Sequence, residues 1–322
     1  MNKFIKYITM FIVMCIFTIS TVIIFPQTSV AATRFTAVSN GVSWTYSLLA
    51  GNAVDVRLAS NVSGQLVVPS SLNGYPVTTV SGTRSSGSYT TMLGSYGANI
   101  TSVIFPDSLK EIGDCSLRSK SKITYVYIPE GVTKIGYMTF ANMDNLSSIT
   151  LPSTLTTLGY GVFYDSGITS LTIPGGVTLW GDYYNKYYSD NESILSRLCI
   201  QCDNLTNVVI EDGVSIIPQY AFASCHSLKS VSLPNTLTKI GDGAFNNSNY
   251  LSSIVIPPNV TTINKLAFNL CDGLAAIYFL NPYTSIYDNK QTISTSAIIY
   301  GFSGSTAEAY STTYSRTFVS ID

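Results

Sequence analysis

A 23-residue pattern that recurs along the chain is the feature that most constrains its fold. Glu211, Pro234 and Pro257 are equivalent points of three consecutive copies, 23 residues apart. The apolar positions around these points read Val208, Ile210, Val214, Ile217, Phe222 and Leu228; then Val231, Leu233, Leu237, Ile240, Phe245 and Leu251; then Ile254, Ile256, Val260, Ile263, Phe268 and Leu274. A period of this length is typical of a solenoid, in which each unit buries its apolar face only against its neighbours. We therefore expect the three phenylalanines to line up along one interior axis.

Further copies extend the array toward the N-terminus, with prolines at the equivalent point (Pro106, Pro129, Pro152 and Pro174). Two apolar residues before that point flank a polar or exposed one, which is the period of a β-strand. A glycine often follows seven residues after it, as at Gly113, Gly136, Gly159 and Gly241, where we expect a turn that needs positive φ. These features predict a mainly β solenoid of nine rungs, each of about 22–23 residues, with short strands, little helix and a cap at both ends.

The N-terminal residues 1–32 have the layout of a secretory signal peptide. Lys3 and Lys6 precede an uncharged apolar run from Tyr7 to Phe25, and small residues follow up to Ala32. The run of 19 residues is also long enough for an uncleaved membrane anchor. Both interpretations send the rest of the chain out of the cytoplasm.

The remaining chain divides at the ends of the repeat array. Residues 33–65 are expected to form an N-terminal β cap, and residues 66–281 the solenoid, with insertions at 83–99 and 182–198. Residues 282–322 are expected to form a C-terminal cap. A Ser at 305 and a Glu at 308 have the spacing of a capping box, which predicts a short helix there.

Charge excludes some classes of partner. Charged residues make up 11% of the chain and the formal net charge is −1. Because no run of Lys or Arg is present, the chain has no electrostatic footprint for nucleic acid or for an anionic membrane surface. We expect an extracellular protein or glycan as partner, and membrane contact only through the N-terminal segment if that segment is not cleaved.

The cysteines and the single histidine give little support for a metal site. Cys199 and Cys202 have CxxC spacing, but no second CxxC accompanies them, and His226 is the one histidine. Cys202, Cys225 and Cys271 occupy the same repeat position, so we expect small buried residues of the stack there. No metal or cofactor is predicted, and the pairing of the cysteines stays open.

The repeats resemble the leucine-rich repeats of the BspA type. Ser230–Leu251 and Ser253–Leu274 match that unit nearly throughout, and the resemblance covers about residues 60–310. The chain departs from the unit at Leu117, where Phe is expected, and at Asp182–Leu198. The resemblance implies an exported protein at a microbial surface, similar to family members that act as adhesins for host matrix proteins. It does not carry over a ligand specificity to particular residues.

No motif in the chain predicts an enzyme, and no catalytic residue is proposed. The stretch Gly301–Ser305 misses the spacing of a nucleophile elbow, because Ser stands where the last Gly is needed. Gly241-Asp242-Gly243 lacks the third glycine of a dinucleotide-binding fingerprint.

Two groups of aromatic residues are the candidate ligand-binding residues. The first group is Trp180, Tyr183, Tyr184, Tyr187 and Tyr188, which offer rigid contact area with polar tips. Its alternative interpretation is that Trp180 fills a core position and the tyrosines fold back over the solenoid. The second group lies at the outward strand position two residues before the anchor, where Tyr127 and Tyr278 alternate with aliphatic and hydroxyl residues.

These features together predict an exported, non-enzymatic adhesion or binding module for macromolecules. A host or matrix protein is the expected ligand, and the expected location is secreted or at the extracellular cell surface. Two alternatives stay open at this point. One is a glycan-binding module that uses the same aromatic residues, and the other is a structural scaffold of the cell envelope without a soluble ligand.

Overall fold

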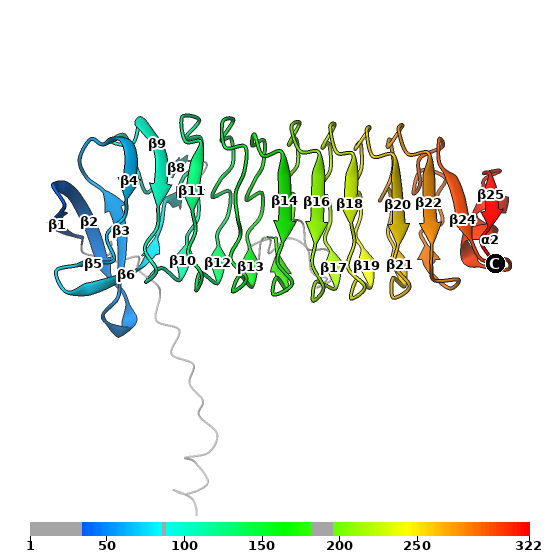
Figure 1. Ribbon diagram of the computed structural model, residues 1–322, viewed down its shortest axis with the longest axis horizontal. Helices are drawn as coiled ribbons and strands as arrows, with labels where there is room; N and C mark the ends of the chain where they lie inside the picture. The colour runs from blue at the N-terminus through cyan, green and yellow to red at the C-terminus, as the bar shows by residue number, and fades with distance from the viewer. Residues whose placement is uncertain (1–33, 86–87, 182–195) are drawn as a thin grey trace, which may run out of the picture. The chain divides into compact units, whose positions relative to one another are not determined.

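The computed structural model describes residues 34–85, 88–181 and 196–322. These residues form a mainly β solenoid of about 11 turns with about 23 residues per turn, and Figure 1 shows the strands following one another along the stack in chain order. The predicted fold class is confirmed. The stack exceeds the nine predicted rungs because strands on either side of the regular repeats also pair with them in parallel.

The predicted signal peptide, residues 1–32, lies outside the described residues, as does most of the predicted insertion at 182–198. Within the described part of the chain, no helix is both long enough and apolar enough to cross a bilayer.

The largest sheet runs through the N-terminal half of the solenoid. Its strands in spatial order are β1 (Phe35–Ser39), β2 (Val42–Leu48), β3 (Val54–Leu58), β6 (Tyr75–Val80), β10 (Glu111–Ile112), β12 (Lys134–Ile135), β13 (Thr157–Leu158) and β15 (Leu179–Trp180), with β5 (Ser71–Leu72) paired to β6. The first three strands are antiparallel. From β3 onward the pairing is parallel, because each rung returns the chain to its starting side before the next strand begins.

The other strands continue the solenoid in smaller sheets. Their bounds are β4 (Ser63–Val67), β9 (Asn99–Ile104) and β11 (Tyr125–Tyr127); β14 (Ser170–Ile173), β16 (Asn207–Ile210) and β18 (Ser230–Ser232); β17 (Ile216–Ile217), β19 (Lys239–Ile240), β21 (Thr262–Ile263) and β23 (Ser285–Ile286); and β20 (Ser253–Ile256), β22 (Ala276–Phe279), β24 (Ile298–Gly301) and β25 (Phe318–Ser320). Strands β7 (Thr83–Ser85) and β8 (Ser88–Thr90) form a separate hairpin. The helical elements are η1 (Ala50–Asn52) and α2 (Thr306–Thr313).

Stacked phenylalanines form the centre of the core, as predicted. Phe222, Phe245 and Phe268 are fully buried, and their ring centroids are 5.6 and 5.5 Å apart in nearly parallel planes. Phe140 and Phe163 stack in the same way at 5.6 Å. Rings at this spacing satisfy the offset-stacked geometry that aromatic pairs prefer.

One rung interrupts this ladder, because a small residue stands at the position of the phenylalanine and a large residue stands at another core position. Cys199 stands at the position of the phenylalanines, and Trp180 stands at a position that other rungs fill with Ile or Leu. Both side chains are buried, and the indole lies edge-on to Phe222 with 6.4 Å between ring centroids. Because the core is close-packed, we infer that the indole fills volume that a phenylalanine at position 199 would otherwise take.

Small donors at one repeat position satisfy carbonyl groups that the ladder buries. The thiol of Cys225 donates to the carbonyl of Cys199 at 3.0 Å, and the thiol of Cys271 donates to the carbonyl of Phe245 at 3.0 Å. Ser248 donates its hydroxyl to the carbonyl of Phe222 at 3.1 Å. A buried carbonyl needs a partner, which explains why small donors, Cys or Ser, occupy this position.

The N-terminal rungs differ in one respect from the prediction. Strands β1 to β3 cover the first rung with buried Trp44 and Tyr46. The segment that leaves the solenoid after this rung is shorter than the predicted insertion at 83–99. The hairpin β7–β8 leaves the rung, whereas Met92 belongs to it. Met92 is fully buried, and its backbone hydrogen-bonds to Leu58 in one neighbouring turn and to Ser116 in the other.

The C-terminal end is closed by α2 and β25. Ser305 is the N-cap of α2 and accepts from the backbone N–H of Glu308 at 3.3 Å. Glu308 Oε2 accepts in turn from the N–H of Gly304 at 2.6 Å. The helix begins where the predicted capping box placed it, since two N-terminal donors are satisfied there.

The exchange between Trp180 and Cys199 predicts coupled stabilities. Cys199→Phe alone overpacks the core and lowers the free energy of unfolding by about 1–3 kcal/mol. Trp180→Ile alone leaves a cavity and is also destabilising. The double variant restores the ordinary rung, so in urea denaturation it is more stable than the sum of the single effects, with a coupling energy of about 0.5–3 kcal/mol.

Thr172→Ala on the exposed face of β14 serves as the control and changes stability by less than about 0.5 kcal/mol. Strictly additive effects of the two core substitutions would show that Trp180 and Cys199 do not share volume.

Candidate binding surfaces

The outward strand positions form a row of exposed residues at the N-terminal end of one face. The parallel register places Val67, Ile104 and Tyr127 side by side on β4, β9 and β11. Val67 is 53% exposed, Tyr127 41% and its neighbour Tyr125 49%. We call these residues, Val67, Ile104, Tyr125 and Tyr127, the N-terminal row. Its strands hydrogen-bond to one another, so the row is a preorganised apolar and aromatic patch.

A second row occupies the same face near the C-terminal end. Val255, Tyr278, Tyr300 and Val319 are aligned across β20, β22, β24 and β25. The rings of Tyr278 and Tyr300 stack at 4.5 Å. Between the two rows the same column holds Thr150, Thr172, Val209 and Ser232, which are exposed or half-buried. The face therefore has aromatic patches at its ends and a more polar middle.

Of the first predicted aromatic group, only Trp180 belongs to the described residues. Trp180 is 4% exposed and belongs to the core, which fits the packing interpretation and corrects its assignment as a ligand contact. Tyr183, Tyr184, Tyr187 and Tyr188 lie outside the described residues. Of the second group, Tyr127 is exposed on β11 and Tyr278 is half-buried on β22.

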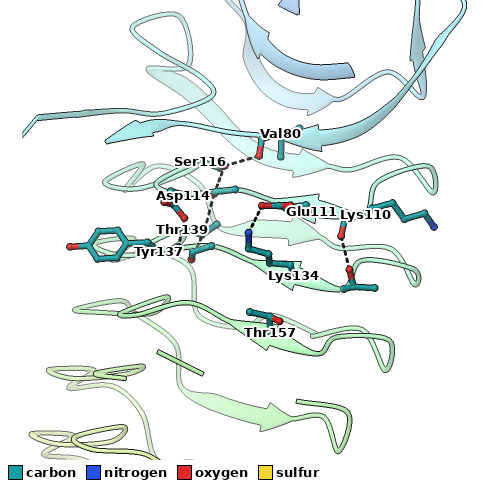
Figure 2. A network of polar contacts seen from close by, with 12 residues as sticks. Val80, Lys110, Glu111, Asp114, Ser116, Lys134, Tyr137, Thr139 and Thr157 are labelled. Carbon is teal, nitrogen blue, oxygen red and sulfur yellow. Dashed lines mark hydrogen bonds and ion pairs between the residues drawn. The ribbon is translucent and has the colours of Figure 1, made fainter. Parts of the chain in front are cut away.

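Sequence reasoning missed a groove on the largest sheet, which we call the N-terminal groove. It has a volume of about 590 Å³ and is lined by Ser81, Gly82, Glu111, Gly113, Asp114, Lys134, Ile135, Gly136, Tyr137, Thr157, Gly159, Tyr160, Leu179 and Gly181. The groove crosses β10, β12, β13 and β15. Figure 2 shows its polar side chains, with Asp114 and Tyr137 to one side of the Glu111–Lys134 pair.

Glycines make the floor of the groove, for a reason that differs from the prediction. Gly113, Gly136 and Gly159 do not have positive φ; the left-handed residues of these turns lie elsewhere, for example at Met138. A Cβ on Gly159 would lie 2.5 Å from the backbone carbon of Gly136 in the rung before. The predicted need for positive φ is therefore wrong, and close approach of neighbouring rungs is what requires glycine.

Polar and aromatic side chains stand on either side of that floor. Lys134 Nζ lies 2.8 Å from Glu111 Oε1. Asp114 Oδ1 accepts from the backbone N–H of Tyr137 at 2.8 Å. The rings of Tyr137 and Tyr160 stack with 5.4 Å between centroids and 10° between planes. Because these contacts join neighbouring rungs, the stacking of the solenoid fixes the positions of the groove residues.

A signal for this groove is present in the chain. The pair Gly-Tyr recurs at Gly136-Tyr137 and at Gly159-Tyr160, one repeat apart. The repeat period places successive tyrosines on one side of the glycine column.

The thiols and acidic groups offer no metal centre among residues 34–85, 88–181 and 196–322. Cys115, Cys199, Cys202, Cys225 and Cys271 are buried and are not joined in disulfides. Burial raises the pKa of the Cys199 and Cys225 thiols well above the usual range, and it raises the pKa of Cys271 to about 12. These thiols are packing groups and weak donors, and a thiolate is disfavoured at each of the three.

The fold and the repeat spacing define a leucine-rich-repeat solenoid. The model of the BspA type leucine rich repeat region matches residues 95–191 and 192–301 in six copies, which is more than half of the chain. The chain belongs to this family. A comparison with curated proteins found no match.

Several solved structures are similar to this chain at low identity. A leucine-rich repeat protein from T. pallidum is 21% identical with a TM-score of 0.50, over 64% of this chain and 86% of that one. One from Bacteroides ovatus is 20% identical with a TM-score of 0.47, over 80% and 83%. A leucine rich cell surface protein from Faecalibacterium prausnitzii is 17% identical with a TM-score of 0.33, over 90% and 96%. At these identities the likeness concerns the fold alone.

The close approach of the rungs predicts the effect of adding one methyl group to the groove floor. Gly159→Ala forces the backbone of Gly136 to move and lowers the free energy of unfolding by about 1–3 kcal/mol. Asn264→Ala is the matched control, since Asn264 occupies the same column in the C-terminal half and already carries a Cβ. Urea denaturation compares the two, and equal stability of both variants would contradict the steric explanation.

Burial of the thiols predicts slow alkylation in the native protein. Iodoacetamide reacts with thiolates, and burial raises the pKa of Cys271 to about 12. Brief treatment near pH 8 therefore leaves the peptide that contains Cys271 unlabelled in mass spectrometry, whereas treatment in guanidinium chloride labels it. Rapid labelling of Cys271 in the native state would contradict its placement in the core.

Proposed function

We propose that the chain is an exported, non-enzymatic binding module that attaches to a protein at or near a microbial cell surface. Membership of the BspA type leucine rich repeat family supports an interaction or adhesion role. The layout of residues 1–32 supports export. The observation that carries the proposal is the N-terminal row of exposed apolar and tyrosine side chains on a rigid strand face.

The chemistry of this row suits a protein ligand. Tyr125 and Tyr127 are 49% and 41% exposed, and Val67 beside them is 53% exposed. Tyrosine supplies large contact area at low cost in side-chain entropy and a hydroxyl that bonds at the rim, which is why it is frequent among interface hot spots. A cluster of such residues on hydrogen-bonded strands needs little ordering when a partner binds.

The surroundings of the one histidine support a non-enzymatic role. His226 Nδ1 lies 2.6 Å from Asp203 Oδ1, and its Nε2 lies 3.0 Å from Asn247 Nδ2. Both ring nitrogens are thus engaged by neighbouring rungs. Among the described residues neither nitrogen contacts a Ser, Thr or Cys side chain that it would activate.

A double variant tests the N-terminal row. Partners are first captured with the chain from residue 34 onward, and matrix glycoproteins are included in a solid-phase panel. Tyr125→Ala together with Tyr127→Ala is expected to weaken protein binding at least about tenfold, because two exposed aromatic anchors are lost. Thr150→Ala with Thr172→Ala is the matched control on the same face, and it leaves the affinity unchanged.

Other outcomes separate the alternatives. Unchanged binding by the tyrosine variant would place the contact elsewhere, and a Tyr183/Tyr184/Tyr187/Tyr188→Ala variant then tests the tyrosine-rich segment. Absence of any protein ligand, combined with tight wall association in cell fractionation, would favour the envelope scaffold over a binding module.

A further inference from the structure

We propose that the N-terminal groove is a second binding site, separate from the N-terminal row, and that its ligand is a linear, uncharged oligosaccharide. The site goes beyond the proposed protein contact in both its location and its ligand class. It combines a long floor made mostly of glycines, carboxylates held by neighbouring rungs and a tyrosine pair.

The shape of the groove suits a chain of linked units. Its floor passes from Ser81 and Gly113 over Gly136 and Gly159 to Gly181. Four steps at about 4.8 Å per rung give a length of roughly 19 Å. A single sugar would occupy only part of this length, whereas an oligosaccharide would contact the side chains of several rungs at once.

The groove residues offer hydrogen-bond acceptors at fixed positions. Glu111 Oε1 contacts Lys134, and Asp114 Oδ1 accepts from a backbone N–H. Within the described part of the chain, the second oxygen of each carboxylate makes no hydrogen bond to protein. Carboxylate oxygens accept from neighbouring hydroxyl groups. A ligand rich in hydroxyls therefore matches what this part of the groove offers.

The tyrosine pair supplies the apolar contact that sugars also need. Tyr137 and Tyr160 stack in nearly parallel planes at about the spacing of the rungs. Their normals thus run along the solenoid axis, and ring edges line the side of the groove. The C–H groups of a pyranose make van der Waals contact with such edges.

The charges of the groove favour a neutral ligand. Lys134 compensates Glu111 through the 2.8 Å ion pair. The carboxyl group of Asp114 lies beside them, so an anionic glycan would place acidic groups together. Lys134 likewise opposes a strongly cationic ligand. The paired arrangement has no single-sign field that would attract a polyion.

Backbone pairing argues against a peptide in the groove. A peptide that adds to a sheet needs an unpaired strand edge. Strands β10, β12 and β13 beneath the groove are each paired on both sides. A peptide lying on this floor would lose water from its own N–H and C=O groups without gaining partners in the ladder.

The groove does not continue into the C-terminal half. The column that holds Gly113, Gly136 and Gly159 there holds Pro218, Gly241, Asn264 and Tyr287. Side chains at most of these positions stand over the floor. Asp242 occupies the repeat position of Asp114 but lies outside the groove lining, which makes it a matched control.

An array of linear oligosaccharides, probed with the chain from residue 34 onward, tests the proposal. The array carries neutral gluco-, manno-, galacto- and N-acetylglucosamine series, uronic-acid and sialylated glycans, and basic and acidic peptides. The wild type is expected to bind at least one neutral series and to prefer longer members. Calorimetry with that oligosaccharide then compares Glu111→Gln, Asp114→Asn and the control Asp242→Asn.

Each groove variant keeps the shape of its side chain, and Asp114→Asn retains an oxygen to accept from Tyr137. Each groove variant is expected to weaken binding of the oligosaccharide at least about tenfold, because a charged acceptor is lost. The control Asp242→Asn and the Tyr125/Tyr127→Ala variant are expected to bind the oligosaccharide like the wild type. If the chain binds no protein but still binds the oligosaccharide, the result counts against the proposed function and not against this site. Wild-type failure on every neutral glycan, preference for a charged glycan or a peptide, or full binding by both groove variants would overturn the proposal.

Discussion

Backbone hydrogen bonds between successive rungs are the constraint on which the rest of the structure depends. The N–H of Phe140 donates to the carbonyl of Val162 at 2.9 Å, and the N–H of Phe222 donates to the carbonyl of Ala244 at 2.9 Å. These groups lie in the interior, where no water replaces a missing partner. Register must therefore be kept from rung to rung, which accounts for the 23-residue period, the small donors beside the phenylalanine ladder and the glycines where rungs approach closely.

The same constraint separates structural positions from positions that are available for binding. Inward residues are held by packing, as Trp180 is against Phe222. Outward positions such as Tyr127 on β11 keep a fixed place on the surface but make little contribution to the core. A solenoid can thus vary its outer columns while its spine is retained. The aromatic rows and the groove lie on different sets of strands and are two such sets of columns, built on one scaffold.

Much of the fold was predictable because the period and the apolar positions report directly on stacking. The phenylalanine ladder, the paired short strands and the capped helix at Ser305 follow from local pattern. The reason for Gly136 and Gly159 was not predictable, because it lies in a contact between rungs rather than in a turn. Trp180 was ambiguous for a similar reason: we infer that its burial requires the small Cys199, which follows it in the same rung only after an insertion. The candidate binding surfaces were only partly predictable; Tyr127 lies at its expected outward position, but the groove depends on side chains from several repeats.

Native-state hydrogen exchange tests the central claim, that buried bonds between rungs hold one continuous stack. Amides at Phe140, Phe163, Phe222 and Phe245 donate to the following rung. The account predicts that all four exchange slowly, with protection near that of global unfolding. Exchange of these amides at the rate of exposed loops, under conditions in which the chain is folded, would contradict it.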